Sequence, residues 1–322
     1  MTDRLTRRSL LAGLAGLAAA AALPTTSTTA GVPSSVLGQQ MNLSLTKLAS
    51  RTHFQGTAWA KSPVTGREYV WQLQAQPTSK GDIEDLHVHR YELVQGKLVF
   101  LDTMVGKAWG HCQTVKVRIS AADNPYLLLG WETYDAAGTQ VGQRVYRCRY
   151  RGGVTTDRYY TDATRVWLPG SYVIPLDCPD WTIAVRRSMG EQEVISWYDE
   201  AELLAATATA PATPHHSVTL TKAPDFQGMC VTGTWDRPDD VWRLNGQTVA
   251  AGATLVPATL WRFPADGVTP AQTLDVSNII NGNSDPEEAE SVLRIGSELW
   301  VGKQTSPSSR RILALRKVGT IG

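Results

Sequence analysis

Polar and apolar residues alternate along much of this chain with a period of two, which is the pattern of a β-strand with one buried face. Within residues 81–131, one such run reaches the tight-turn pair Gln95-Gly96 and a second run follows it, so the stretch predicts a hairpin. The chain restarts at His111 with a further strand and turns again at residues 123–125. We therefore expect one antiparallel sheet to end and the next to begin inside this stretch.

Similar runs recur at intervals of about 55 to 60 residues, a spacing that indicates a radial array of sheets. Two of the strands that precede them open with the same tripeptide, Phe-Gln-Gly, at residues 54–56 and 226–228. Five copies fit the chain, so the sequence predicts an all-β fold, a five-bladed β-propeller. The repeated runs begin at Tyr69, Leu128, Trp181, Val241 and Leu299.

Four of the predicted blades have four strands each, and the fifth has only three, at residues 291–295, 299–304 and 310–316. Residues 42–48 alternate with a period of two and supply the missing strand. A ring closed by this N-terminal strand has no long exposed edge. The other strands are expected at residues 54–61, 68–74, 85–93 and 97–103, at 112–120, 126–133, 144–150 and 164–168, at 171–176, 181–187, 193–198 and 217–220, and at 227–235, 240–245, 259–263 and 272–276.

The N-terminal residues have the pattern of an export signal. A twin arginine at residues 7–8 precedes an apolar segment, 10–23, that is shorter than the roughly 20 residues needed to span a bilayer. We expect a twin-arginine signal peptide and leader at 1–30, a flexible segment at 31–40 and a single propeller domain at 41–322. The protein is then secreted, extracellular or associated with the cell wall, without stable membrane insertion.

The composition and charge of the chain are those of an ordinary globular protein. Hydrophobic residues make up 42% of it, and eleven Trp and ten Tyr, against four Phe, favour strands over helices. The 31 basic and 30 acidic residues nearly balance, so no strong positive field recruits nucleic acid. The four cysteines match no zinc-binding spacing, and a disulfide and buried free thiols both remain open for Cys112, Cys148, Cys178 and Cys230.

A set of short motifs resembles one known group of proteins. The motifs are Gly81-Asp82, Gly110-His111, Trp131-Glu132 and residues 226–228, 288–290 and 299–302. With them the sequence resembles the secreted teichoic acid biosynthesis protein C-like proteins, whose propeller is shared with helveticin J-type bacteriocins and staphylococcal phage receptor-binding proteins. The resemblance implies a five-bladed propeller and a link to cell-envelope glycopolymers, and it implies no set of catalytic residues.

Polar residues near the starts of the innermost strands are expected to converge on the central channel of the propeller, where they suit a small polar ligand, an ion or a sugar. Alternatively, they hydrogen-bond to one another and to trapped water, and so close the channel. The candidates from the first strands are Gln55, His111, Gln227 and Glu290. The candidates from the second strands are Gln72, Glu132, Arg243 and Lys303.

Loops at the rim of the blades carry a second group of candidates, because exposed aromatic rings stack on sugars. Most tryptophans of a propeller pack between blades instead, where a large apolar side chain is needed. The rim candidates are Asp82, Trp109, Tyr159 and Tyr160. Trp167 and Trp261 are further aromatic residues near predicted loops or blade edges.

A glycosidase needs two carboxylates several ångströms apart. Three of the available ones, Asp82, Asp177 and Asp236, lie at predicted turns, where Asp forms local hydrogen bonds. Glu132 and Glu290 complete the set. No serine-hydrolase or nucleotide-binding motif is present in the sequence.

His87 and His89 lie on one face of a predicted strand and would bind zinc or copper only with a third ligand, which the sequence does not place nearby. The alternative is the solvated face of an outer strand. We therefore expect neither a metal nor a cofactor.

These observations predict a secreted, non-catalytic β-propeller that binds a bacterial cell-envelope glycopolymer, teichoic-acid-like or another polysaccharide. One alternative is an exported glycoside hydrolase or lyase that uses channel carboxylates. Another is a helveticin-like secreted antibacterial protein. The residues favour binding over enzymatic activity, which stays open. The sequence identifies neither the glycan nor the oligomeric state.

Overall fold

The computed structural model describes residues 40–43, 53–78, 84–134, 139–157, 160–170, 172–179, 181–223, 226–245, 258–276, 287–305 and 312–320. All of them belong to one compact unit, Gly31–Gly322. Within these ranges the chain forms strands β1 to β21 and a single short helix, α1 (Glu200–Ala205). The described residues contain no helix long and apolar enough to cross a membrane. The predicted leader lies outside the described residues.

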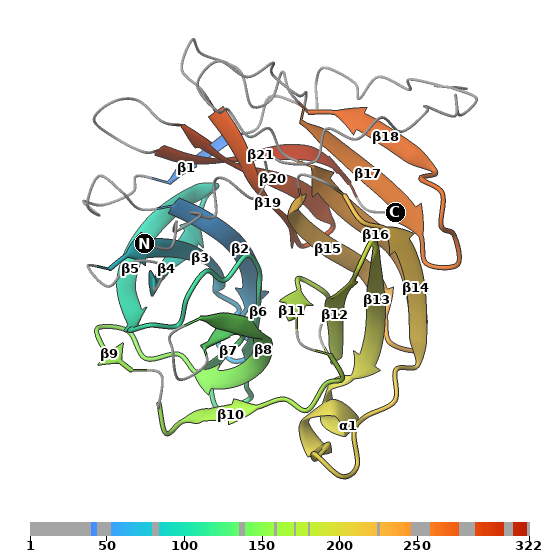
Figure 1. Cartoon of the computed structure of the whole chain (residues 1–322). Helices are drawn as coiled ribbons and strands as arrows, with labels where there is room; N and C mark the ends of the chain where they lie inside the picture. Colours follow the sequence, from blue (N-terminus) through green and yellow to red (C-terminus); the bar gives the residue numbers. More distant parts are fainter. Residues whose placement is uncertain are drawn as a thin grey trace, which may run out of the picture. The chain divides into compact units, whose positions relative to one another are not determined.

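Apart from the short β9, the first three sheets follow one another along the chain (Figure 1), and neighbouring strands pair antiparallel except where β9 joins β5 in parallel. The first sheet consists of β2 (His53–Lys61), β3 (Glu68–Pro77), β4 (Glu84–Val94), β5 (Lys97–Gly106) and β9 (Thr155–Thr156). The second consists of β6 (Val115–Ile119), β7 (Pro125–Tyr134), β8 (Gln140–Arg149) and β10 (Ala163–Arg165). The third consists of β11 (Val173–Leu176), β12 (Thr182–Met189), β13 (Gln192–Asp199) and β14 (His216–Thr221).

The last two sheets repeat this order, except that the outermost strand of the fifth comes from the start of the described chain. The fourth sheet consists of β15 (Phe226–Thr234), β16 (Arg237–Asn245), β17 (Thr259–Pro264) and β18 (Gln272–Asp275). The fifth consists of β19 (Glu287–Ile295), β20 (Glu298–Thr305), β21 (Ile312–Thr320) and β1 (Gln40–Leu43).

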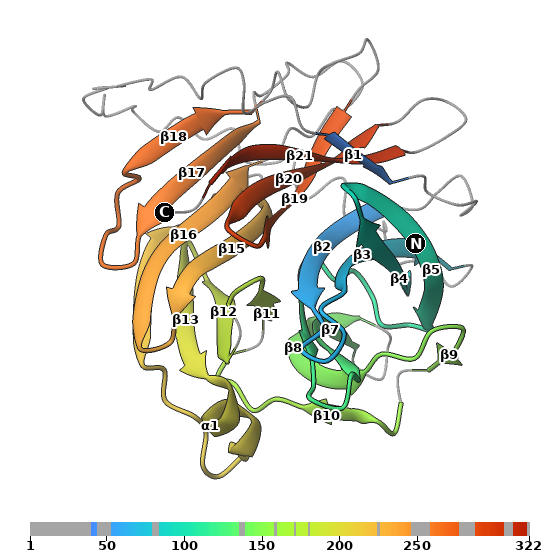
Figure 2. The same cartoon turned by 180° about the vertical axis from the view of Figure 1, so that it is seen from behind.

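The first strand of each sheet lies innermost, and these five strands form a ring. β2 contacts β6, β6 contacts β11, β11 contacts β15, β15 contacts β19, and β19 returns to β2. Figure 2 shows four of these inner strands, β2, β11, β15 and β19, from behind, around a common centre. Five sheets around such a ring are the blades of a five-bladed β-propeller, which confirms the fold predicted from the repeat.

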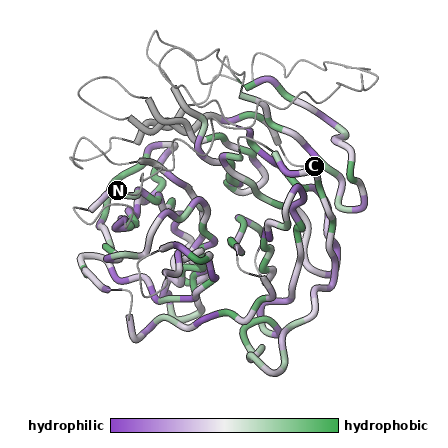
Figure 3. Tube along the Cα trace, in the orientation of Figure 1, coloured by the Kyte–Doolittle hydropathy of each residue, from purple (hydrophilic) through white to green (hydrophobic). Residues whose placement is uncertain are grey.

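The strands form where the sequence alternates, and they end where it supplies turn residues. Figure 3 shows hydrophilic and hydrophobic positions alternating along the strands. Gln95 and Gly96 both have positive φ, 49° and 74°, as a two-residue turn between antiparallel strands requires, and they join β4 to β5. The predicted strands of the first four blades agree with the observed ones to within a few residues, and only the short β9 has no predicted counterpart.

Five hydrophobic clusters hold the blades together, and each draws residues from two neighbouring sheets. Burying one Leu or Ile side chain contributes about 1.5–3 kcal/mol, so each cluster stabilises the contact between its two blades. Representative pairs from the five clusters are Trp71 and Leu129, Leu128 and Ile183, Trp197 and Phe263, Trp242 and Val292, and Tyr91 and Trp300.

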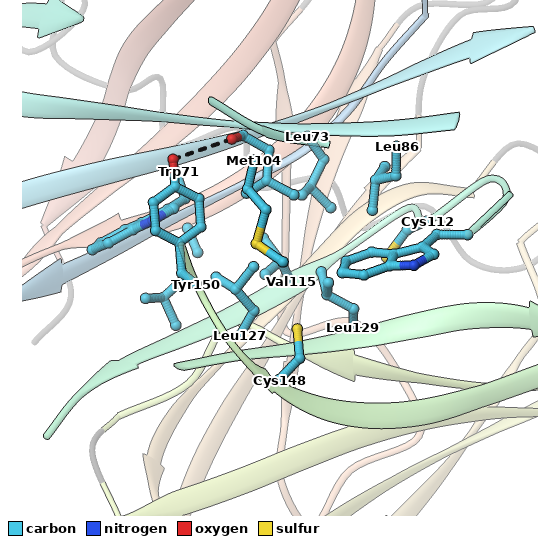
Figure 4. Close-up of a cluster of buried hydrophobic side chains, with 14 of the residues drawn as sticks. Trp71, Leu73, Leu86, Met104, Cys112, Val115, Leu127, Leu129, Cys148 and Tyr150 are labelled. Carbon is cyan, nitrogen blue, oxygen red and sulfur yellow. Dashed lines mark hydrogen bonds between the residues drawn. The ribbon is translucent and has the colours of Figure 1, made fainter. Parts of the chain in front are cut away.

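The cluster between the first and second sheets contains two of the four cysteines. Figure 4 shows Cys112 and Cys148 among apolar side chains such as Leu127 and Met104. All four thiols are buried and free. Burial raises the pKa of the Cys112 thiol to about 12, so it stays protonated and acts as a small apolar residue.

β1 pairs antiparallel with β21, with Gln40 opposite Arg316 and Leu43 opposite Leu313. The sequence predicts that residues 42–48 pair with the last strand at residues 310–316. Residues 44–48 lie outside the described ranges.

Candidate functional site

Three of the five inner strands carry a β-bulge at the same point. The pairing of β2 with β3 skips Gln55, the pairing of β15 with β16 skips Gln227, and the pairing of β19 with β20 skips Glu290. A bulge leaves one residue outside the ladder and redirects its side chain. The repeated Phe-Gln-Gly tripeptide is therefore the sequence of this bulge, and three of the four first-strand candidates occupy equivalent positions.

The residues that follow the bulges bring the inner strands into close contact. A Cβ atom on Gly56 would lie 2.7 Å from the carbonyl oxygen of Gln113, and one on Gly228 would lie 3.0 Å from the Cα of Ser291. Only glycine allows this approach, because any side chain would meet the backbone of the next blade. The glycine of the tripeptide thus narrows the centre of the ring.

The space that remains at the centre is a cavity of about 10 Å³, lined by residues from all five blades, including Gly56, Thr114, Asp177, Gly228 and Ser291. This volume holds about one water molecule. A sugar does not fit there, so the centre of the ring is closed at this level.

Hydrogen bonds between blades complete this closure. The backbone N–H of Arg294 donates to Oδ2 of Asp177 over 2.9 Å, and the hydroxyl of Thr114 donates to the carbonyl oxygen of Pro175. Asp177, weighed as a glycosidase carboxylate, therefore lies in the seal between blades and not in an open site.

Two predicted channel residues lie away from the cavity, in contacts within the first and second blades. Nδ1 of His111 lies 2.8 Å from Oε2 of Glu84, and the imidazole is one third exposed. Glu132 is nearly buried, and it accepts hydrogen bonds from the hydroxyl of Tyr134 and, over 2.8 Å, from the amide of Gln140. His111 thus remains accessible, whereas both carboxylate oxygens of Glu132 already have partners.

The rim candidates divide into buried and undescribed residues. Trp109 is fully buried, it packs 4.3 Å from Trp131 between ring centroids, and its Nε1 donates to the carbonyl oxygen of Asp157. Its ring is a core element, because a large apolar body fills the space between two blades. Tyr160 is partly buried against the same cluster. Asp82 and Tyr159 lie outside the described residues.

The histidine pair of β4 is not the solvated face considered as its alternative. Nδ1 of His89 lies 2.7 Å from the hydroxyl of Thr103, and its Nε2 lies 3.3 Å from Oε1 of Gln74. Burial lowers the pKa of His89 to about 3, and neighbouring His87 adds to the shift. Among the described residues no three His, Cys, Asp or Glu side chains are grouped to hold a metal.

A larger pocket of about 520 Å³ opens on the face where the inner strands begin. Tyr172 directly precedes β11, Phe226 is the first residue of β15, and Gln113 comes shortly before β6, which places the pocket over the second, third and fourth blades. We call it the entry pocket. It is lined by Gln113, Gln143, Tyr172, Arg186, Lys222 and Phe226, among others.

A buried ion cluster forms one wall of the entry pocket. Nε of Arg186 donates to Oε2 of Glu193 over 2.5 Å, and a terminal nitrogen of Arg243 donates to Oε1 over 2.5 Å. The same nitrogen of Arg243 donates to the carbonyl oxygen of Thr221 over 2.7 Å. The Arg186 guanidinium carbon also lies 4.0 Å from the centroid of the Phe226 ring. Predicted candidate Arg243 is therefore a buried support of the pocket, and Arg186 is the residue that reaches it.

The mouth of the pocket combines an exposed aromatic ring with polar groups. Tyr172 is 46% exposed, and Lys222 is also exposed. The side-chain amide of Gln143 donates to the carbonyl oxygen of His111 over 2.9 Å, which links the pocket to that predicted candidate. Among the described lining residues there is no acidic side chain.

Sequence reasoning missed Arg186, Lys222 and Tyr172. It named a second-strand candidate in every blade except the third, although Arg186 lies where the apolar run of β12 becomes polar. A search for charged residues at the ends of apolar strands, on the face where Phe226 opens β15, would have found it.

Known proteins resemble this chain in structure and not in sequence. No protein-family model matches it, and no curated protein sequence matches it. A tail fiber of a Staphylococcus aureus phage matches 88% of this chain and 52% of its own length, with a TM-score of 0.61 and 12% identity. The chain thus spans about half of that fiber.

Two solved enzyme structures show weaker likeness. An exo-β-1,3-galactanase from Phanerochaete chrysosporium matches 87% of this chain and 64% of its own, with a TM-score of 0.49 and 8% identity. A GH43_1 enzyme from Xanthomonas citri, complexed with xylose, matches 88% of this chain and 91% of its own, with a TM-score of 0.45 and 10% identity. The likeness to the tail fiber supports the β-propeller fold.

Proposed function

We propose that this protein is an exported β-propeller that binds a bacterial cell-envelope glycopolymer in the entry pocket, without catalysing a reaction on it. The observation that carries the proposal is the pocket itself. Its volume of about 520 Å³ lies in the range of small-molecule sites and accommodates one or two sugar units. The twin arginines at residues 7–8 and the resemblance of the sequence to envelope-associated propellers support the location.

The chemistry of the pocket fits a sugar. The exposed face of Tyr172 offers a surface on which a sugar ring stacks, while Gln113 and Gln143 offer amide groups to its hydroxyls. Sugars present this same combination of apolar C–H faces and polar edges. Binding therefore needs no residue beyond those that line the pocket.

The glycosidase alternative requires an acid and a second carboxylate beside the bound sugar. Glu193 is hydrogen-bonded to the lining residue Arg186, and both of its oxygens are engaged by arginines. This arrangement supports binding over hydrolysis at the entry pocket. Glu290 remains the carboxylate to test for the alternative.

The test is binding of purified cell-wall polysaccharides by the wild-type protein and by Tyr172→Ala, with soluble sugar products measured in the same samples. We expect binding without product release, and weaker binding by the variant. Phe100→Ala is the matched control, because Phe100 is similarly exposed, at 41%, on β5 of another blade. Product release that Glu290→Gln abolishes would support the hydrolase instead, and growth inhibition of neighbouring bacteria would support the antibacterial alternative.

A further inference from the structure

The Arg186 side chain has hydrogen-bonding capacity that the protein does not use. Its side chain is 10% exposed, and its Nε is occupied by Glu193. Among the described residues, no group accepts a hydrogen bond from its two terminal nitrogens. A guanidinium that is nine-tenths buried and borders a pocket therefore presents unpaired donors to whatever enters.

The cluster behind Arg186 carries an excess of positive charge. Two guanidinium groups, those of Arg186 and Arg243, share the single carboxylate of Glu193, which is fully buried. Burying an uncompensated charge is unfavourable, and a partner of opposite charge relieves that cost. Lys222 adds a second cation at the mouth of the same pocket. The electrostatic complement of this wall is an anion.

We propose that the entry pocket recognises an anionic group on its glycan, either the carboxylate of a uronic acid or the phosphate of a phosphodiester-linked unit. The terminal nitrogens of Arg186 donate to two oxygens of the group in the bidentate manner typical of arginine, and Lys222 supplies a second positive charge. This inference rests on the proposed function, because it names the chemical class of the bound polymer.

Two further residues hold Arg186 in place for this role. The Phe226 ring supports one face of the guanidinium, and Glu193 fixes its Nε edge, so the opposite edge is directed away from both. Arg243, anchored on the carbonyl oxygen of Thr221, holds the carboxylate of Glu193 in place. Glu193 and Arg243 are positioning residues, since neither lines the pocket.

The experiment compares three probes by isothermal titration: oligogalacturonate, which carries carboxylates, polyglycerol phosphate, which carries phosphodiesters, and neutral dextran. The wild-type protein is expected to bind one or both anionic probes and to bind them more weakly as salt rises, because screening weakens exposed charge pairs. The two anionic probes distinguish the two sources of the charge. Dextran is expected not to compete.

Two variants test the residues. Arg186→Lys keeps the charge and removes the planar fork, and we expect it to weaken binding of the anionic probe at least about tenfold. Lys222→Gln is expected to weaken it by about three- to tenfold, whereas Lys97→Gln, an equivalent change at an exposed lysine at the start of β5, is expected to leave it unchanged. Melting temperatures show whether Arg186→Lys remains folded, and Lys222→Gln tests the proposal at an exposed position.

The outcomes distinguish the failure of the anion site from the failure of glycan binding itself. Equal binding of neutral and anionic probes, unaffected by Lys222→Gln, would overturn the anion site and leave glycan binding standing. Binding of neither class of polymer, by protein of normal melting temperature, would overturn both. Binding of the anionic probe with losses confined to Arg186→Lys and Lys222→Gln supports both.

Discussion

The hydroxyl oxygens of Thr57 and Ser291 lie 3.2 Å apart, although 234 positions separate the two residues in the chain. Thr57 belongs to the inner strand of the first blade and Ser291 to that of the last. Both side chains are buried, so each hydroxyl depends on the other for a hydrogen bond. The ring of inner strands is thus joined at its seam by this pair of side chains as well as by apolar packing.

Replacing Thr57 with Val is expected to leave the Ser291 hydroxyl buried without its partner and to lower the free energy of unfolding by about 1–3 kcal/mol. The double variant Thr57→Val with Ser291→Ala should recover part of this loss, since neither hydroxyl then remains unpaired. Urea denaturation of the two single variants and the double variant measures the coupling. Fully additive losses would show that the two hydroxyls do not interact.

Gly56→Ala is expected to destabilise the protein by about 1–3 kcal/mol, because the new methyl group meets the backbone of Gln113 and Thr114. Gly319→Ala is the control. Gly319 lies in β21, and nothing lies within 4 Å of a Cβ added there. Thermal unfolding of both variants checks the prediction, and equal melting temperatures would contradict the close contact between the first two blades.

We propose that β1 closes the last blade, so deletion of residues 41–49 should expose the edge of β21 and cause aggregation or a large fall in melting temperature. Deletion of residues 31–39, which precede β1, serves as the control and should leave melting unchanged. Size-exclusion chromatography and thermal unfolding report both effects. A monomeric 41–49 deletion with normal melting would mean that the ring closes without this strand.

Stability is expected to fall as pH decreases from about 6.5 toward 3, with His89 contributing to the fall. Its pKa in the folded protein is about 3 and its unfolded value is 6.5, so the unfolded chain binds more protons in this window and is favoured by acid. Urea denaturation at several pH values should show a smaller pH dependence for His89→Gln than for wild type. Equal pH dependence of the two proteins would contradict the role of His89.

We propose that export requires both arginines at residues 7–8, since a twin-arginine motif is a receptor-read address. Changing both to lysine should retain the precursor in the cytoplasm while the charge of the segment stays the same. Immunoblots of cell and medium fractions measure this. Unchanged secretion would remove the argument for the twin-arginine route.

The sequence predicts the blades well and the site poorly, for reasons that particular residues make clear. A strand is a local pattern, so the alternation around Gln95-Gly96 is enough to place β4 and β5. The buried state of His89 is not local, since it depends on Gln74 and Thr103 of the adjoining strands.

The entry pocket is harder still to predict, because its walls come from different blades. Arg186 lies on β12 of the third blade and Phe226 on β15 of the fourth, and only the packing of the two blades brings the guanidinium onto the ring. The repeated tripeptide at Gln55 and Gln227 was recognisable in the sequence. Its meaning, a bulge followed by a glycine that lets blades touch, required the pairing of the strands.

The small cavity at the centre of the ring also limits the path that a long polymer could take over the protein. With room for about one water molecule, the axis gives no passage from one face of the propeller to the other. If the protein binds a polysaccharide as we propose, the polymer lies across the face instead of threading through the ring, and internal units of a chain are then as accessible to the protein as chain ends. Affinity per polymer chain should then rise with the number of repeating units, because a longer chain contains more equivalent units that can occupy the same site.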